Sequence, residues 1–194
     1  MISYKKSKII LKKSIIKLGE EFINTDKCLN RVTSKNIYVQ SYHPAGDNAA
    51  FDGYAIKSSD TDKLNKKIFK KFKIVGSIAA GNRPLKKKIK KFQTVEIMTG
   101  ALMPKSFDTI IPIEQINFYP NKKNAKYILI NKKISKFEHL RFKGSDYKKG
   151  DLLISKGTIL QPNHILALKT LGIKKIKVKK KPNILFFSTG NEIT

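Results

Sequence analysis

Apolar residues near the start of the chain recur at roughly helical spacing. The pattern consists of six residues: Ile9, Ile10, Leu11, Ile15, Ile16 and Leu18. It predicts an amphipathic helix that ends at Gly19, a residue suited to a C-cap. A second helix is predicted from Thr25, whose hydroxyl can cap a helix, with Cys28 and Val32 on one face.

Between Phe51 and about Leu140 the pattern changes to short runs that are typical of strands. Five such runs are separated by turn residues, at 54–56, 72–75, 94–98, 109–113 and 127–130. Five or more short strands without long helical patterns predict a compact, barrel-like β domain inserted between helical pieces.

After Gly144 the pattern becomes mixed. Residues 150–154 are typical of a strand, and Pro162 suits the first position of a helix that Gly172 would end. The apolar run 184–187 leads into a polar turn, as a buried strand of a doubly wound sheet does, and ligands gather at the carboxyl ends of such strands.

These patterns predict an α+β protein of three parts. A linker domain of helices and short strands is discontinuous and covers residues 1–45 and 141–180, while the β domain is inserted at 46–140. Residues 181–194 supply the first strand of an α/β, doubly wound domain that we expect to be truncated, because one strand cannot make a sheet.

The charge of the chain is strongly positive, with 41 Lys and Arg against 14 Asp and Glu and a net charge of +27. Such a charge suggests a polyanionic partner. However, the only arginines are Arg31, Arg83 and Arg141, and nucleic-acid sites usually use the planar fork of Arg for bidentate contacts. The lysines are scattered as on solvated faces, so we predict no specific nucleic-acid partner and only non-specific adhesion to polyanions.

Cysteine and histidine offer little chemistry. The single cysteine, Cys28, excludes an internal disulfide and is predicted to be a small core residue in a reducing compartment. His43, His139 and His164 lack the short spacings of metal motifs. No apolar stretch has the length of a membrane span, and lysines interrupt the N-terminal apolar run, so we predict a cytoplasmic protein without a membrane partner.

One twelve-residue segment carries a recognisable signature. The segment 44–55 reads Pro-Ala-Gly-Asp-Asn-Ala-Ala-Phe-Asp-Gly-Tyr-Ala. It resembles P-x-F-D-N-S-A-M-D-G-Y-A of the molybdopterin molybdenumtransferases, a family that includes the gephyrin E domain. Gly46, Ala49 and Phe51 replace the family's Phe, Ser and Met, whereas both aspartates, Asp47 and Asp52, remain.

Three further segments are similar to motifs of the same family. Residues 97–104 (Ile-Met-Thr-Gly-Ala-Leu-Met-Pro) resemble I-M-T-G-A-P-L-P, and residues 140–146 (Leu-Arg-Phe-Lys-Gly-Ser-Asp) resemble I-R-x-x-G-E-D, with Ser145 in place of Glu. Residues 187–192 (Phe-Ser-Thr-Gly-Asn-Glu) resemble S-T-G-[DN]-E, which opens the family's pterin-binding domain. Each match is short, but four in this order over essentially the whole chain make coincidence implausible.

The resemblance implies an activity in molybdenum cofactor biosynthesis: insertion of molybdate into adenylylated molybdopterin, with Mg²⁺ as cofactor and release of AMP. Such chemistry requires cations, metal-binding carboxylates and backbone donors around an oxyanion and a phosphate. The family also implies an elongated homodimer, in which the β domain of one subunit and the pterin domain of the other form the active site.

By the same resemblance, specific residues acquire roles. Asp52, Thr99 and Glu192 are the expected catalytic residues, and Glu192 is also expected near Mg²⁺ and the nucleotide phosphate. Arg141 and Asp146 are expected to be an anion contact and its orienting partner. The remaining expected substrate-binding residues are Ser188, Gly190 and Asn191, and Asp47 and Asn48 are secondary candidates.

Each assignment has a purely structural alternative. Asp52 and Gly53 could simply form a hairpin turn, because Asp-Gly is the strongest short turn signal. Arg141 and Asp146 could be a surface ion pair, and Ser188 or Asn191 a helix N-cap. Asp47 and Asn48 are residues that often order loops by bonding to nearby backbone.

The resemblance also implies that nearly all of the pterin domain is missing, so we expect an N-terminal fragment that is inactive alone, whether a piece of a longer protein or the product of a degraded gene. Two functions from other classes stay open: a non-catalytic dimerisation or scaffold fragment, and a lysine-rich nucleic-acid-binding module.

Overall fold

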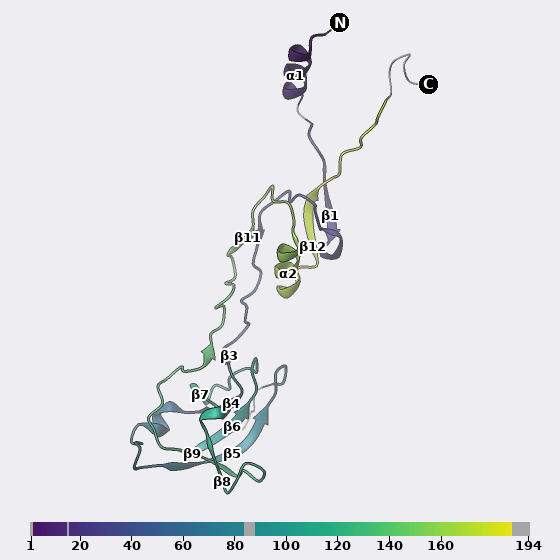
Figure 1. Cartoon of the computed structure of the whole chain (residues 1–194). Helices are drawn as coiled ribbons and strands as arrows, with labels where there is room; N and C mark the ends of the chain where they lie inside the picture. The colour runs from purple at the N-terminus through teal and green to yellow at the C-terminus, as the bar shows by residue number, and fades with distance from the viewer. Residues whose placement is uncertain (1, 15, 84–87, 188–194) are drawn as a thin grey trace. The chain divides into compact units, whose positions relative to one another are not determined.

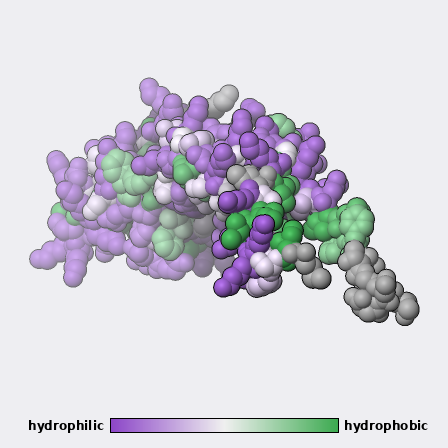
Figure 2. Space-filling view, turned by 90° about the horizontal axis from the view of Figure 1, so that it is seen from above, coloured by the Kyte–Doolittle hydropathy of each residue, from purple (hydrophilic) through white to green (hydrophobic). Residues whose placement is uncertain are grey.

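The computed structural model describes residues 2–14, 16–83 and 88–187 (Figure 1). Contacts divide the chain into two compact units. We call Gln40–Lys149 the sheet unit, and Met1–Val39 together with Gly150–Thr194 the split unit. Among the helices that the structure describes, none is long and apolar enough to cross a membrane. The face shown in Figure 2 is mainly hydrophilic, with some apolar areas between the polar side chains.

A six-stranded mixed sheet forms the centre of the sheet unit (Figure 1). Its strands in spatial order are β7 (Thr109–Pro112), β4 (Gly53–Ile56), β6 (Gln93–Ile97), β5 (Lys70–Ile78), β9 (Tyr127–Ile130) and β8 (Asn117–Tyr119). All neighbours are antiparallel except β5 and β6, which are parallel and shift register between Ile74 and Ser77. Two 3-10 turns, η2 (Ser58–Thr61) and η3 (Ile113–Gln115), follow β4 and β7.

Both faces of this sheet are covered by apolar side chains. Along β4, Tyr54 and Ile56 pack into one buried cluster and Ala55 packs into another. Consequently all four residues of β4 are buried, and β7 shows the same pattern. Strands buried on both faces read as continuous apolar runs rather than alternating ones, as these two do.

Close packing at the start of β4 requires a glycine. A Cβ atom on Gly53 would lie 2.1 Å from the backbone oxygen of Ile111 on the neighbouring strand β7. Only a residue without a side chain permits that approach. Gly53 therefore fixes the position of its predecessor, Asp52, at the end of the sheet.

Within its described residues, the split unit contains two small antiparallel ladders and two α-helices. Strand β1 (Glu20–Asn24) pairs with β12 (Lys175–Lys179), and β2 (Ile37–Tyr38) pairs with β11 (Leu152–Ile154). Helix α2 (Pro162–Thr170) packs near the 3-10 turn η1 (Thr25–Lys27). The core of the split unit includes Cys28, Leu160, Leu168, Ile176 and Val178. Cys28 is fully buried, which confirms the prediction of a core cysteine, and this burial raises the pKa of its thiol.

The helical predictions in the split unit need correction. Helix α1 spans Tyr4–Lys13 and ends at Ser14 rather than at Gly19. The backbone of Ser14 is extended (φ −76°, ψ 103°), which ends the helix there, while its N–H still donates to the carbonyls of Ile10 and Leu11. The second predicted helix is a single 3-10 turn, because Thr33 instead donates its backbone N–H to Thr158 across the unit. Tertiary pairing overrides helical propensity there.

The predicted strand at 184–187 is not a strand in the described part of the chain. Ile184, Leu185, Phe186 and Phe187 are 67–88% exposed and belong to no ladder. A strand exists only where a neighbour supplies its hydrogen bonds, and no described segment does so here. The structure thus contains a mixed sheet in the inserted region. The doubly wound domain stays a prediction.

Candidate functional site

Three of the four sequence motifs meet around one short segment of the sheet unit. On one side, the Ala49 N–H donates to Ala101 at 2.9 Å, and the Gly100 N–H donates to Ala49 at 2.8 Å. On the other side, β3 (Asn48–Ala49) pairs with β10 (Leu140–Arg141). Segments more than 40 residues apart are thus held side by side by backbone hydrogen bonds, which positions their side chains firmly.

Asp52 and Thr99 contact each other directly. The Thr99 backbone N–H and its hydroxyl both donate to Oδ1 of Asp52, each at 2.7 Å. These two bonds, the backbone one first, lower the pKa of the exposed Asp52 carboxyl. Among the described residues, Oδ2 of Asp52 has no hydrogen-bond donor, so an ionised oxygen with one fixed orientation is available to a ligand.

Arg141 and Asp146 form a second charged pair. The Arg141 guanidinium donates to Oδ2 of Asp146, and the Ser145 hydroxyl donates to Oδ1 at 3.3 Å. Nε2 of His43 lies 3.8 Å from the same Oδ2, a neighbour that the sequence motifs did not indicate. Both side chains are partly exposed, at 48% for Arg141 and 30% for Asp146, so an anion could reach the guanidinium.

The turn between Arg141 and Asp146 is tightly constrained. The Gly144 N–H donates to Pro44 at 3.0 Å, and the Asp146 N–H donates to His43 at 3.1 Å. Gly144 has φ +70°, and a Cβ atom there would lie 2.6 Å from the Tyr42 ring. The third motif is therefore anchored to the start of the first motif and to the residues just before it.

The secondary candidates Asp47 and Asn48 behave differently from each other. Oδ1 of Asp47 accepts the Lys143 N–H at 2.8 Å, which ties the first motif to the third. Asn48 is only 9% exposed, and its Oδ1 has no hydrogen-bond partner among the described residues. An unsatisfied buried acceptor costs about 1–3 kcal/mol. Asp47 therefore joins the first motif to the third by a hydrogen bond. The buried Asn48 oxygen, by contrast, has no hydrogen-bond donor among the described residues, and its cross-strand neighbour is Arg141.

Comparison with known proteins agrees with this convergence of motifs. The family model described as MoeA N-terminal region (domain I and II) matches residues 2–172. The chain belongs to the MoeA family. Molybdopterin molybdenumtransferases of Staphylococcus aureus (strain N315) and Bacillus subtilis (strain 168) are 31% identical over 168 residues and 29% identical over 179 residues. The matches cover 87% and 91% of this chain, respectively.

Structural similarity extends over the same region. The crystal structure of the molybdopterin biosynthesis moeA protein from Pyrococcus horikoshii OT3 superposes with a TM-score of 0.80 at 29% identity, over 90% of this chain and 45% of that chain. The chain spans only 39% of the S. aureus relative and 41% of the B. subtilis relative. The mixed sheet with few helices is thus shared with a MoeA protein, but the matched region is less than half of each relative.

The fourth motif of this MoeA-family chain cannot be placed. Ser188, Gly190, Asn191 and Glu192 lie outside the described residues. Among the described ones, no group of three His, Cys, Asp or Glu side chains is arranged to hold a metal ion. The donor chemistry at Asp52 still suits Mg²⁺, which prefers one or two carboxylates together with substrate phosphates.

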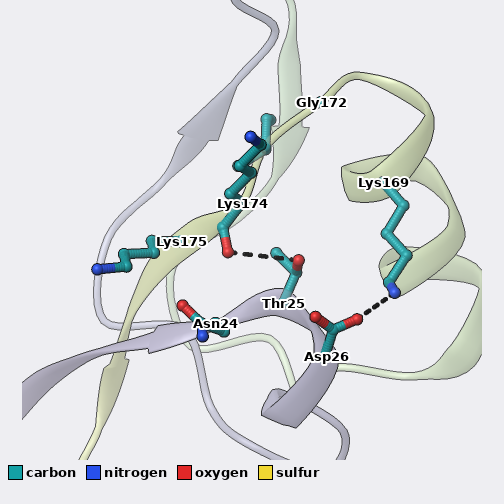
Figure 3. A pocket seen from close by; sticks show the side chains of 8 residues that line it. Asn24, Thr25, Asp26, Lys169, Gly172, Lys174 and Lys175 are labelled. Atoms are coloured by element: carbon teal, nitrogen blue, oxygen red, sulfur yellow. Dashed lines mark hydrogen bonds and ion pairs between the residues drawn. The ribbon is translucent and has the colours of Figure 1, made fainter.

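A pocket in the split unit of this MoeA-family chain is separate from the motif residues (Figure 3). Its volume is about 440 Å³. The Asp26 carboxylate is held there by the Lys169 ammonium group, which lowers the pKa of that carboxyl, and the Thr25 hydroxyl donates to the Lys174 carbonyl. The side chains of Lys174 and Lys175 point in different directions, so the pocket does not present converging cations (Figure 3).

Proposed function

We propose that this chain contributes to molybdenum cofactor biosynthesis as part of a molybdopterin molybdenumtransferase, which inserts molybdate into adenylylated molybdopterin and releases AMP. The observation that carries the proposal is the Asp52 carboxylate, fixed through one oxygen by Thr99 and open at the other. The names of the relatives support the substrate class.

In this proposal each motif residue has a defined task. Thr99 fixes the orientation of the Asp52 carboxylate and keeps it ionised, so that Oδ2 can accept a proton or ligate a metal. Arg141 attracts an anionic group, and Asp146 holds the guanidinium in place. Ser188, Gly190 and Asn191 bind the substrate on the pterin-domain side.

Glu192 and Asp52 would hold Mg²⁺, which supplies positive charge next to phosphate and oxyanion oxygens. Together with Arg141, a cation held there would offset the negative charge of molybdate and of the pterin phosphate. Asp52 and Glu192 are far apart in the sequence, and in this proposal they approach each other where a β domain meets a pterin domain.

The proposed working form is a cytoplasmic homodimer in which the β domain of one subunit meets the pterin domain of the other. The chain spans about two fifths of the curated relatives. We therefore expect no turnover from these 194 residues alone. The domain boundaries that we propose are 1–45 with 141–180, 46–140, and 181–194.

A chimera tests the function. The chain replaces the matching N-terminal region of the B. subtilis relative, and cofactor production is measured in cells that lack their own enzyme. We expect production with the native chain and its loss with Asp52→Asn. Asp62→Asn is the matched control, because Asp62 is an exposed carboxylate whose ion pair in the described part of the chain is with Lys133, at 3.4 Å.

Circular dichroism and the sedimentation of each chimera verify that the variants fold and assemble equally. Normal cofactor production by a folded Asp52→Asn chimera would show that the site is misplaced. A folded native chimera without production would show that this chain has lost the activity of its relatives.

A further inference from the structure

A pocket in the sheet unit lies at the opposite end of strand β4 from Asp52. Strand β4 begins just after Asp52 and ends just before Lys57. Its neighbours β6 and β7 are antiparallel to it, and Ile56, the last residue of β4, pairs with Thr109, the first residue of β7. The segments that precede β6 and β7 therefore meet the segment that follows β4, and a pocket of about 390 Å³ lies among them.

The lining of this pocket is positively charged. It contains three ammonium groups, two hydroxyls and one carboxylate, which belong to Lys57, Lys90, Lys91, Ser59, Ser106 and Asp60. The ion pairs of the described residues do not involve these three lysines. Three positive charges against one negative charge leave a net charge of +2 on the lining. A concave surface of one sign concentrates ligands of the opposite sign.

Hydrogen bonds fix the backbone around the pocket. The Phe92 N–H donates to Oδ2 of Asp60 at 2.9 Å, which joins the segment before β6 to the segment after β4. The Ser58 N–H and hydroxyl donate to the two carboxylate oxygens of Asp108, at 2.7 and 2.9 Å, and so join the segment after β4 to the segment before β7. Because the three segments are already held together, a ligand has little backbone to order when it binds.

The hydroxyls add a second kind of donor to the ammonium groups. Ser59 and Ser106 are exposed, and within residues 2–14, 16–83 and 88–187 no hydrogen bond occupies their hydroxyls. A phosphate group has several strongly accepting oxygens, and hydrogen bonds to such charged oxygens are stronger than those between neutral groups. A lone lysine on a convex surface attracts any anion, whereas cations and hydroxyls around one hollow favour a compact anion with many acceptors.

We propose that this pocket binds the dianionic phosphate group of a small molecule through the three lysines and the two serines. The charge of such a group matches the net charge of +2 on the lining. The volume of about 390 Å³ exceeds what a phosphate group fills, so a small organic part can enter with it. The inference is independent of the proposed function, because the pocket contains none of the motif residues assigned to catalysis.

NMR titration of the 194-residue chain with glycerol 3-phosphate, at constant ionic strength, tests the pocket. We expect saturable shifts of the backbone amides at 57–60, 90–93 and 106–108. Replacing both Lys90 and Lys91 by Gln should weaken binding about tenfold. The matched control replaces Lys122 and Lys123 by Gln, which removes the same charge from exposed lysines of the same unit. Ser106→Ala, which leaves the charge unchanged, should weaken binding about threefold.

Inorganic phosphate and acetate are titrated in parallel, and melting curves establish that all variants fold. Tighter binding of the ester supports a phosphorylated small molecule as the ligand, and equal binding of inorganic phosphate supports the phosphate ion itself. Equal saturation by acetate, or native affinity in Ser106→Ala, would overturn the phosphate assignment. Shifts that do not saturate, or an equal loss of affinity in the Lys122 and Lys123 control, would reduce binding to the overall charge of the chain and remove the pocket.

The proposed function is tested separately by the Asp52→Asn chimera. Native phosphate binding by a chain whose chimera makes no cofactor would leave the pocket standing without the enzyme. Cofactor production by a chimera whose pocket binds no phosphate would do the reverse.

Discussion

The sheet unit and the split unit stabilise their structures in different ways. The sheet unit buries both faces of a six-stranded sheet, and its motif loops are tied together by backbone hydrogen bonds. The split unit has two-stranded ladders and one buried cluster, and its helix α1 has no buried residue. The comparison indicates that the candidate site is carried by the unit with the more extensive core, where small displacements of side chains are costly.

The largest expected effect separates the two units by burial. Phe72 is fully buried in the sheet unit, whereas Phe22 in the split unit is 70% exposed. We expect Phe72→Ala to lower the free energy of unfolding by about 3–5 kcal/mol. Phe22→Ala should change it by less than about 1 kcal/mol, because the Phe22 ring is mostly exposed and its interaction with the Lys177 ammonium is weak. Urea unfolding followed by circular dichroism measures both, and equal losses would contradict the contrast.

The next largest effect is expected at a glycine where two strands of the sheet unit approach closely. We expect Gly53→Ala to cost about 3 kcal/mol, because the added Cβ would collide with the Ile111 carbonyl and separate β4 from β7. In the split unit, Gly19→Ala meets only the flexible Lys180 side chain, at 3.3 Å, and should be nearly neutral. Thermal melts of the two variants compare them directly. A Gly53→Ala protein with native stability would mean that the strands are more loosely paired than the structure has them.

High salt should distinguish two carboxyl groups whose pKa values are both lowered. Glu20 in the split unit has its pKa lowered to about 2 by hydrogen bonds and charge from Lys177 and Lys179. Asp52 in the sheet unit has its pKa lowered by hydrogen bonds from the uncharged groups of Thr99. In NMR titrations we expect molar NaCl to raise the pKa of Glu20 but to leave the pKa of Asp52 nearly unchanged, because salt screens charges and not short hydrogen bonds.

The lowered pKa of Glu20 also predicts how the stability of the protein changes in acid. Because the pKa of Glu20 is lowered in the folded state, its ion pairs stabilise the protein at pH values above 4.5, the ordinary pKa of this carboxyl. This stabilisation is lost as the pH falls toward about 2. Glu20→Gln should therefore flatten the dependence of the urea midpoint on pH in that window. An unchanged slope would show that the lysine contacts do not persist in solution.

The smallest effect concerns the exposed ion pair of the sheet unit. Arg141→Gln should change the free energy of unfolding by less than about 1 kcal/mol, because partly exposed ion pairs contribute little. Anion binding should nevertheless weaken, and titration with molybdate followed by NMR shifts of the 140–146 turn measures this. Loss of the fold in this variant would assign Arg141 a structural role instead.

The amino-acid pattern was sufficient for much of the sheet but not for its connections. The runs at 54–56, 94–98, 109–113 and 127–130 coincide with β4, β6, β7 and β9, because apolar residues with turn signals between them identify strands. The parallel pairing of β5 with β6 and the edge strand β8 could not be read from the chain, since pairing depends on distant partners. The extra helix predicted from Thr25 was wrong for the same reason.

At the site, the resemblance to a family indicated Asp52 and Thr99, and the structure brings these two residues into contact. Nothing in the local sequence indicated His43, because its approach to Asp146 depends on the way the chain folds back through Gly144.

The single sulfhydryl gives the split unit its own reporter. Cys28 is completely enclosed there, donates its S–H to the Thr25 carbonyl, and is the only such group in the chain. A thiol-directed dye can react only when this unit opens, whereas opening of the sheet unit exposes no sulfhydryl. The rate of dye incorporation in the unmodified protein would therefore measure the opening of the split unit independently of the sheet unit.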